Sequence, residues 1–271
     1  MNCILFVLLM ICQRATLGLK SNFILFSRWA SMNVHLDWVT LLHQMRPNDP
    51  SKTKLVYVPT ASMAYSKEST RKRGEQRRRN RYDAKQRMAA LQEAYELDAV
   101  MLNLDEPELN KEETKRMLAD NAAVIFVDGG NTFYLKQHME SSGFKDMIKK
   151  PLENGLVYMG ASAGAICAGN SIGTAYWKGW DSVGSAEEWV GWEEWTSQRE
   201  KGLGIIDKDF FPHYQEDIHS TLVKEKLKNY PYEVKICTDE MAVVQSYKDN
   251  ILRTFDFFAD GSMGSLQMQQ L

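Results

Sequence analysis

Two glycine-rich turns, each between a short apolar run and a helical pattern, constrain the fold of this chain most strongly. Ala123–Val127 has the composition of a buried strand and leads into the turn at residues 128–131, after which a helix is expected from about Thr132. Leu156–Met159 is a second apolar run and leads into the turn at residues 160–164. Strands and helices that alternate through glycine turns are typical of parallel β-α-β units. We therefore predict an α/β fold with a mostly parallel central sheet and helices on both of its faces.

The rest of the pattern extends this sheet. Lys54–Thr60 and Ala99–Leu104 predict two more strands, separated by a long charged helix over residues 67–96. Ala242–Gln245 and Ile251–Phe255 flank a polar turn and predict an antiparallel hairpin near the end of the chain. Ligands bind at the carboxyl ends of the strands in parallel sheets, and both glycine turns would lie at that edge.

The ends of the chain differ from this pattern. A single domain is predicted over residues 22–258, preceded by an apolar extension at residues 1–21 and followed by a polar tail at residues 259–271 that is expected to be frayed. The apolar run at residues 2–12 is too short to cross a bilayer. We expect a cytoplasmic protein whose main domain does not enter a membrane. Secretion is the alternative if residues 1–15 are a signal, although no basic residue precedes the apolar run.

Charge and cysteine content exclude several classes of function. The formal net charge of −2 gives no general attraction to nucleic acid or to an anionic membrane. The four cysteines lack the spacing of metal ligands, and free thiols in a reducing compartment are expected. The turn at residues 128–131 lacks the lysine and the spacing of phosphate-binding loops. We therefore expect no metal, no cofactor and no nucleic-acid partner.

The second glycine turn carries a candidate nucleophile. Residues 160–164 read Gly-Ala-Ser-Ala-Gly and fit the pattern G-x-S-x-G. That pattern places a serine on a sharp turn between a strand and a helix, where small neighbours prevent collisions. Ser162 is therefore predicted to stand at a helix N-terminus, with backbone N–H groups directed towards its hydroxyl. A small-residue turn without chemistry is the alternative interpretation.

A serine hydroxyl needs a base to become a nucleophile at neutral pH. Of the five histidines, His213 has the most suitable surroundings, because Pro212 fixes the backbone before it and aromatic neighbours would exclude water. A core histidine with a satisfied ring is the alternative when His213 is considered alone.

Three motifs in order carry a family resemblance: Gly-Gly-Asn-Thr-Phe at residues 129–133, Gly-Ala-Ser-Ala-Gly-Ala at 160–165, and Phe-Pro-His-Tyr at 211–214. Together they resemble the peptidase E and cyanophycinase family of serine peptidases, over about residues 22–258. The resemblance implies a class I glutamine amidotransferase-like fold. The chain departs from the family at its first strand, where no glycine-rich turn follows.

The resemblance also implies roles for individual residues. Ser162 matches the nucleophile and His213 the base, while the backbone N–H groups of Gly130 and Ala163 match the oxyanion hole. Asn131, inside the first motif, is expected to contact substrate.

Two acidic residues compete for the third place in the catalytic triad. Glu240 lies where the family's Ser-His-Glu arrangement places its acid, and Asp181 is the rival because an acidic residue also follows the elbow in this family. Either would orient the imidazole and stabilise its charged form. Glu240 is slightly favoured.

Two biased segments have both a functional and a structural interpretation. Five of the seven tryptophans lie between Trp177 and Trp195, and they would either line a substrate cleft, with Trp180 as a substrate contact, or pack a loop or a homodimer interface. The basic run at residues 71–87 has helical spacing and intervening acids, which favours a solvated helix face over a phosphate contact.

These observations predict a serine exopeptidase that acts on short peptides and needs no metal. By resemblance, the preferred substrate would carry an N-terminal aspartate. A cyanophycinase-like hydrolase of β-aspartyl-arginine is the nearest alternative, and a non-catalytic binding or scaffold protein with the same fold is the alternative from another class. Glutamine amidotransfer is disfavoured because those enzymes use a cysteine at the elbow, and Cys167 lies beyond it.

Overall fold

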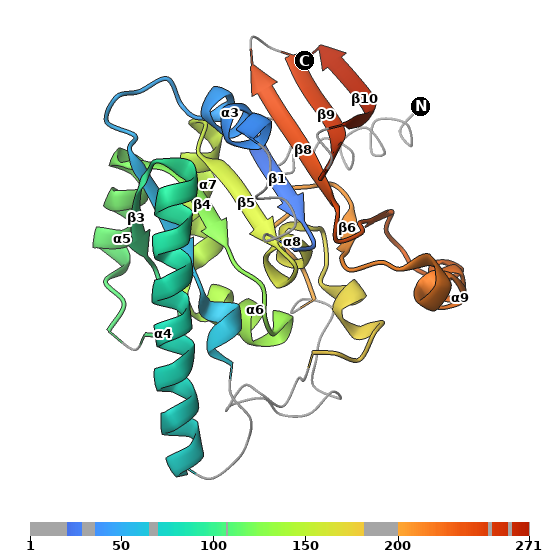
Figure 1. Ribbon diagram of the computed structural model, residues 1–271, viewed down its shortest axis with the longest axis horizontal. Coiled ribbons are helices and arrows are strands. Elements are labelled where there is room, and N and C mark those ends of the chain that lie inside the picture. The colour runs from blue at the N-terminus through green and yellow to red at the C-terminus, as the bar shows by residue number, and fades with distance from the viewer. Residues whose placement is uncertain are drawn as a thin grey trace, which may run out of the picture.

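The computed structural model describes residues 21–28, 36–64, 70–106, 108–181, 200–248, 251–259 and 262–270. At its centre is an eight-stranded sheet with the strand order β10-β9-β8-β1-β5-β4-β2-β3 (Figure 1). Its strands are β1 (Asn22–Phe26), β2 (Lys54–Val58), β3 (Asp98–Met101), β4 (Ala122–Val127), β5 (Val157–Ala161), β8 (Met241–Lys248), β9 (Ile251–Phe258) and β10 (Met263–Gln270). Strands β1, β5, β4, β2 and β3 pair in parallel, and β8 joins β1 antiparallel. The predicted fold class is confirmed, including the antiparallel hairpin of β8 and β9.

Helices cover both faces of this sheet. They are α3 (Leu36–Met45), α4 (Thr70–Tyr95), α5 (Lys111–Asp120), α6 (Thr132–Ser142), α7 (Phe144–Glu153) and α8 (Ala163–Ala168), with short 3₁₀ helices η2 (Thr60–Met63) and η3 (Gly173–Tyr176). Helix α9 (Glu216–Leu227) lies to the side of this sheet (Figure 1). Alternate side chains of β1 enter two different cores: Phe23 and Leu25 pack with residues of α5 to α8, whereas Ile24 and Phe26 pack with residues of α3 and α4. Helix α4 lies in front of the sheet in Figure 1.

A small second sheet lies beside the carboxyl end of β1. It consists of β6 (Asp209–Phe211) and β7 (Val234–Ile236), which pair in parallel. The loop after β6 and the loop after β7 leave the same end of this sheet because the two strands run in the same direction. Residues from both loops therefore reach the edge where β1 and β5 end.

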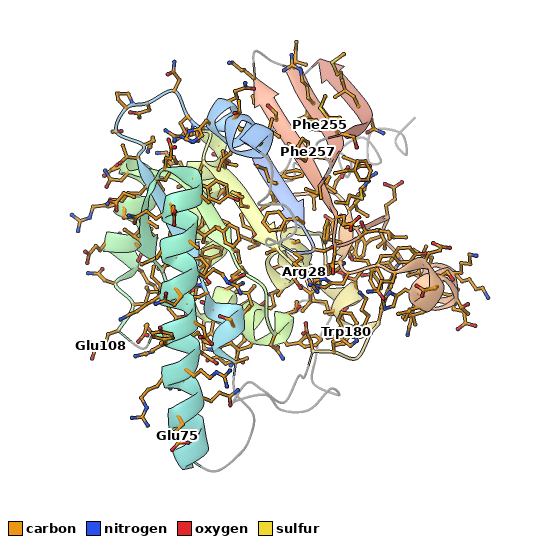
Figure 2. The ribbon with its side chains drawn as sticks, in the orientation of Figure 1. Arg28, Glu75, Glu108, Trp180, Phe255 and Phe257 are labelled. Atoms are coloured by element: carbon orange, nitrogen blue, oxygen red, sulfur yellow. The ribbon has the colours of Figure 1, made fainter. Side chains whose placement is uncertain are left out.

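The chain termini depart from the sequence-based picture in one respect. The tail was expected to be frayed, but residues 263–270 form β10, which pairs antiparallel with β9 at the edge of the sheet. On the inner side of this hairpin, Phe255 and Phe257 of β9 are buried in the core that α3 also contacts (Figure 2). The apolar run at residues 2–12 and the tryptophans at 189, 192 and 195 lie outside the described residues.

Helix α4 contains the whole of the basic run at residues 71–87. Three of its arginines form ion pairs with acidic residues that follow neighbouring strands: Arg77 with Asp105, Arg81 with Glu106, and Arg87 with Asp128. Among the residues that the structure describes, no helix is both long and apolar enough to traverse a bilayer.

Candidate active site

Ser162 lies on a strained turn between β5 and α8. Its φ of 47° and ψ of −106° fall outside the regions that a residue with a side chain readily adopts. Backbone contacts hold this conformation: the Ser162 N–H donates to the Phe26 carbonyl at 2.9 Å, and the Ser162 carbonyl accepts from the Ile166 N–H at 2.9 Å. The turn is therefore tied to β1 on one side and to the first turn of α8 on the other.

The glycines of the elbow are required by close backbone approach. A Cβ atom at Gly164 would lie 2.2 Å from the Val127 carbonyl oxygen on β4. A Cβ atom at Gly160 would lie 2.8 Å from the Gly164 carbonyl oxygen. Neither contact is possible between real atoms, so the sequence pattern at residues 160–164 follows from packing of the elbow against β4 and against itself.

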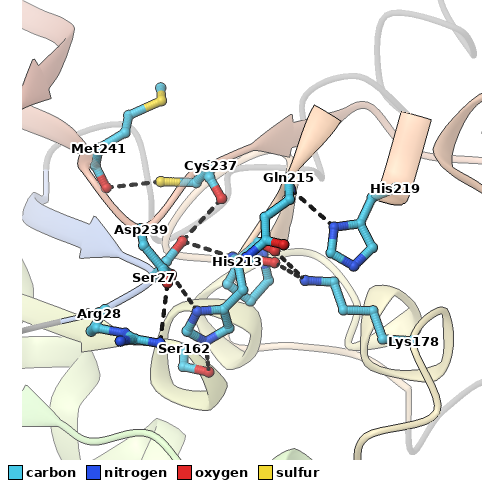
Figure 3. A network of polar contacts seen from close by, with 11 residues as sticks. Ser27, Arg28, Ser162, Lys178, His213, Gln215, His219, Cys237, Asp239 and Met241 are labelled. Atoms are coloured by element: carbon cyan, nitrogen blue, oxygen red, sulfur yellow. Dashed lines mark hydrogen bonds and ion pairs between the residues drawn. The ribbon is translucent and has the colours of Figure 1, made fainter. Parts of the chain in front are cut away.

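His213 contacts the candidate nucleophile directly. Its Nε2 lies 2.9 Å from the Ser162 Oγ (Figure 3). This residue comes from the loop after β6 and also has a positive φ, of 56°. Its backbone N–H donates to the Ser27 Oγ at 2.9 Å, which ties the loop to the carboxyl end of β1. The structure thus brings together the two residues that the sequence proposed as nucleophile and base.

The acid beside His213 is Asp239, which the sequence analysis did not select. Its Oδ1 lies 2.5 Å from the His213 Nδ1, the ring nitrogen opposite the one that meets Ser162. The other carboxylate oxygen of Asp239 forms an ion pair with Arg28 at 3.2 Å. A carboxylate in this position fixes the imidazole tautomer and stabilises the imidazolium.

The two acids that the sequence proposed for this position lie elsewhere. Glu240 has an exposed side chain, and its backbone carbonyl accepts a hydrogen bond from the Ala259 N–H at 2.8 Å. Asp181 accepts a hydrogen bond from the Thr132 N–H at 3.0 Å, at the start of α6. Burial raises the pKa of the Asp181 carboxyl, although the hydrogen bonds from Thr132 and the His213 charge oppose that rise. The expectation of Glu240 or Asp181 as the partner of the imidazole is therefore corrected to Asp239.

The proposed oxyanion donors lie on two turns that meet at Ser162. Ala163 is the first residue of α8, where N–H groups have no acceptor within the helix. Gly130 follows β4 with a φ of 140°, and a Cβ atom there would lie 2.3 Å from the Ala61 carbonyl oxygen, so only glycine fits. The preceding Gly129 faces the elbow, because a Cβ atom on it would lie 3.1 Å from the Ser162 Cβ.

A cavity of about 320 Å³ opens beside the nucleophile. It is lined by Ser27, Arg28, Arg87, Asp128, Gly129, Ala161 and Ser162. Asp128 is buried, and its carboxylate accepts hydrogen bonds from Tyr57, from Arg87 and from the Gly129 N–H. Burial and the charge of Asp128 raise the pKa of the Tyr57 hydroxyl, which therefore stays protonated and donates. This network fixes the glycine turn and holds one arginine at the cavity wall.

The two predicted substrate contacts differ in position. Asn131 caps α6, since its side-chain oxygen accepts from the Tyr134 N–H at 2.9 Å. Trp180 is 63% exposed, and its ring centroid lies 5.9 Å from that of His213 (Figure 2).

Cys167 is buried in α8, and burial raises the pKa of its thiol to about 12, so the thiol is protonated at neutral pH.

Comparison with known proteins identifies the family. The model of peptidase family S51 matches residues 26–251, which include Ser162, His213 and Asp239. This chain belongs to peptidase family S51.

Several curated peptidases match parts of the chain. The uncharacterized peptidase Lin0382 of Listeria innocua is 29% identical over 112 residues, which are 41% of this chain and 49% of that protein. Peptidase E of Haemophilus influenzae is 42% identical over 59 residues, which are 22% of this chain and 27% of that protein. The chain thus matches about half the length, or less, of these curated relatives.

Solved structures share the fold over nearly the whole chain. A peptidase from an acI-B1 actinobacterium superposes with a TM-score of 0.56 at 15% identity, covering 93% of this chain and 94% of that one. A protein from Listeria monocytogenes EGD-e superposes with the same TM-score at 19% identity, covering 93% of this chain and 99% of that one. At these identities the likeness concerns the fold.

Three residues of this S51 member that surround His213 were not predicted from its sequence. Ser27 and Arg28 follow β1 directly, at the carboxyl end of a strand next to β5, and Asp239 precedes Glu240 in the loop after β7. The position of Ser27 and Arg28 after an apolar strand was the signal that could have revealed them, because strand carboxyl ends gather at one edge.

Proposed function

We propose that this chain is a serine peptidase of the peptidase E type, which cleaves peptide bonds through an acyl-enzyme on Ser162. The observation that carries the proposal is the contact of 2.9 Å between Ser162 Oγ and His213 Nε2, made by a serine on a strained elbow. Asp239 on the far side of the imidazole supplies the third group of a hydrolytic triad. Membership of family S51 supports the same reaction class.

The mechanism follows from these positions. His213 removes the hydroxyl proton as Ser162 Oγ bonds to the substrate carbonyl carbon, and the carbonyl π electrons move to oxygen. The backbone N–H groups of Gly130 and Ala163 stabilise that oxyanion. When the C–N bond breaks, His213 gives the proton to the leaving amine. Water then attacks the acyl-enzyme through the same steps, which releases the acid product and restores Ser162.

The cavity beside Ser162 supports a short, acidic substrate. Arg28 and Arg87 line it, each in an ion pair with an aspartate (Asp239 and Asp128), and a guanidinium matches the planar geometry of a carboxylate. A cavity of about 320 Å³ is at the small end of ligand sites, which favours a short peptide. We extend the proposal to an exopeptidase that acts on short peptides with an N-terminal aspartate, with Asn131 and Trp180 as further substrate contacts.

The test combines a mechanism-based label with a set of substrates. A fluorophosphonate is expected to label the wild-type protein and not Ser162→Ala, which should also lose at least about 10⁴-fold in peptide hydrolysis. Asp-X dipeptides should be cleaved faster than Ala-X dipeptides of the same X. A folded wild-type protein that takes no label would contradict the peptidase proposal and favour the scaffold alternative. Faster cleavage of β-Asp-Arg than of Asp-X would reject the substrate assignment and favour the cyanophycinase-like alternative.

A further inference from the structure

Lys178, which follows η3, extends its ammonium group to the backbone that carries His213. Its Nζ donates hydrogen bonds to the carbonyl oxygens of Pro212 and of His213, the latter at 2.8 Å (Figure 3). The same atom lies 4.4 Å from the Phe211 ring centroid and 4.3 Å from the Trp180 ring centroid. Two carbonyl acceptors and two aromatic faces hold this half-buried cation in one place.

The backbone of His213 needs such support. Its φ of 56° costs on the order of 1–3 kcal/mol for a residue with a bulky side chain, and such strain persists only where surrounding contacts determine it. Ser27 accepts the N–H of His213 at 2.9 Å, and Lys178 binds its carbonyl oxygen. One residue further on, the Tyr214 N–H donates to the Cys237 carbonyl at 3.0 Å.

Only one of these contacts brings a charged side chain to the strained peptide. The Ser27 hydroxyl is neutral and also donates to the Cys237 carbonyl at 3.0 Å, so it serves two partners. Hydrogen bonds from an ionised donor are about twice as strong as those between neutral groups. The ammonium of Lys178 is therefore the strongest of the polar contacts described above for the His213 backbone.

We propose that Lys178 is a positioning residue for the general base: by binding the Pro212 and His213 carbonyls, it maintains the left-handed backbone that places His213 Nε2 against Ser162. This inference rests on the proposed function, because it assigns His213 the role of base. The side chain does not take part in bond making. It acts through the backbone of His213, so its removal should slow activation of the nucleophile more than it weakens binding.

The charge state of Lys178 gives this role a pH signature. Burial lowers the pKa of Lys178 to about 8, although the negative charge of Asp239 opposes that shift. Among the described residues, His213 and, on α9, His219 are further titratable groups that interact with it. Above about pH 8 the ammonium loses its proton and its bonds to the carbonyls weaken, so the rate should fall. Because the folded pKa lies below that of an unfolded lysine, the deprotonation of Lys178 does not by itself destabilise the fold.

The experiment measures the rate of fluorophosphonate labelling of Ser162 in the full chain, over the Ser162→Ala background, from pH 6 to pH 10. Lys178→Met is expected to lower the rate about 10- to 100-fold, the loss expected from a small displacement of a catalytic group. Most of that loss should appear in the labelling step rather than in probe affinity. Lys178→Arg keeps the charge and the donors, and it should label within about threefold of wild type and remain active to higher pH. Lys145→Met is the matched control, since Lys145 also reaches a backbone carbonyl, that of Gly202, and should label at the wild-type rate.

Two outcomes overturn the inference alone. The first is a labelled wild-type protein and a folded Lys178→Met variant that reacts at the same rate. The second applies if thermal melting shows that Lys178→Met does not fold. In that case the inference is overturned if the labelling rate of the wild-type protein stays constant to pH 10. It is also overturned if Lys178→Arg does not shift the pH above which the labelling rate falls. A folded wild-type protein that takes no label at any pH instead overturns the proposed function, and the inference with it.

Discussion

Ser162 and His213 both have a positive φ, of 47° and 56°, but different kinds of contact hold them in that conformation. Around Ser162 the contacts are between backbone atoms: its N–H binds the Phe26 carbonyl, and glycine and alanine neighbours let the chain pass without collision. Around His213 they involve side chains, because Ser27 accepts its N–H and Lys178 binds its carbonyl oxygen. One half of the site is enforced by steric fit, and the other by polar contacts from separate elements.

The two halves of the site should therefore respond differently to mutation. The elbow lies on the central sheet, where β5 is paired in parallel on both sides with β1 and β4. His213 and Asp239, the proposed base and its acid, come from loops after β6 and β7, a sheet of only two strands. A change at the elbow should therefore perturb the fold together with the chemistry. A change around His213 should affect the chemistry and leave the central sheet intact.

After Ser162→Ala, the largest effect is expected from a change of Asp239, the acid beside His213. Asp239→Asn keeps the size of the side chain but removes the charge that favours the correct imidazole tautomer. Hydrolysis should fall about 10³- to 10⁴-fold, with a melting temperature close to that of wild type. Glu240→Gln is the matched control, and it should stay within about twofold because the Glu240 side chain is exposed. A larger loss in Glu240→Gln than in Asp239→Asn would restore the assignment made from the sequence.

The elbow gives a smaller effect of a different kind. Gly164→Ala places a Cβ atom where only 2.2 Å separates it from the Val127 carbonyl oxygen, so β4, β5 or α8 must shift. We expect a loss of about 2–4 kcal/mol in the free energy of unfolding, measured by urea denaturation, together with slower labelling of Ser162. Gly74→Ala on α4 is the control, because nothing lies within 4 Å of its Cβ position. That variant should be unchanged or up to about 1 kcal/mol more stable. Equal stability of the two variants would show that the elbow has room to adapt.

The same contrast explains how much the sequence could predict. The elbow is formed by consecutive residues. Its glycine pattern has a steric cause and can therefore be recognised from the sequence without coordinates. His213 could be proposed because proline and aromatic residues surround it. The sequence offered Glu240 or Asp181 as the acid, and nothing in it pointed to Asp239 instead of its neighbour Glu240, since loop residues have no periodicity. In the structure, the Cys237 N–H donates to the Phe211 carbonyl at 3.0 Å, and this contact between distant segments brings the start of the Asp239 loop beside the His213 loop.

The strand β10 was missed for a related reason. Three of its apolar side chains are strongly exposed, so no alternation of buried and polar residues marks it as a strand: Met263, Leu266 and Met268. Backbone pairing with β9 forms it instead. Sequence patterns report burial, and an edge strand held by main-chain hydrogen bonds carries little of that signal.

The smallest effect is expected at Asp181, the acid that the sequence offered as a rival partner of His213. Its carboxylate accepts the Thr132 N–H at the start of α6, and burial raises its pKa. The folded protein therefore holds the Asp181 proton more tightly than the unfolded chain does. As pH rises from the unfolded to the folded pKa, the stability that this group contributes decreases.

Asp181→Asn keeps an oxygen acceptor for the Thr132 N–H and removes the ionisation. Urea unfolding between pH 4 and pH 7 should show the variant becoming more stable relative to wild type as pH rises, by less than about 1 kcal/mol in total. Labelling of Ser162 should stay within about twofold, since His213 already has Asp239 as its carboxylate partner. A tenfold loss of labelling would mean that the Asp181 charge acts on His213. In that case, His213 would depend on two carboxylates, those of Asp181 and Asp239. Its supporting contacts would then come from more elements of the chain than those of the elbow do.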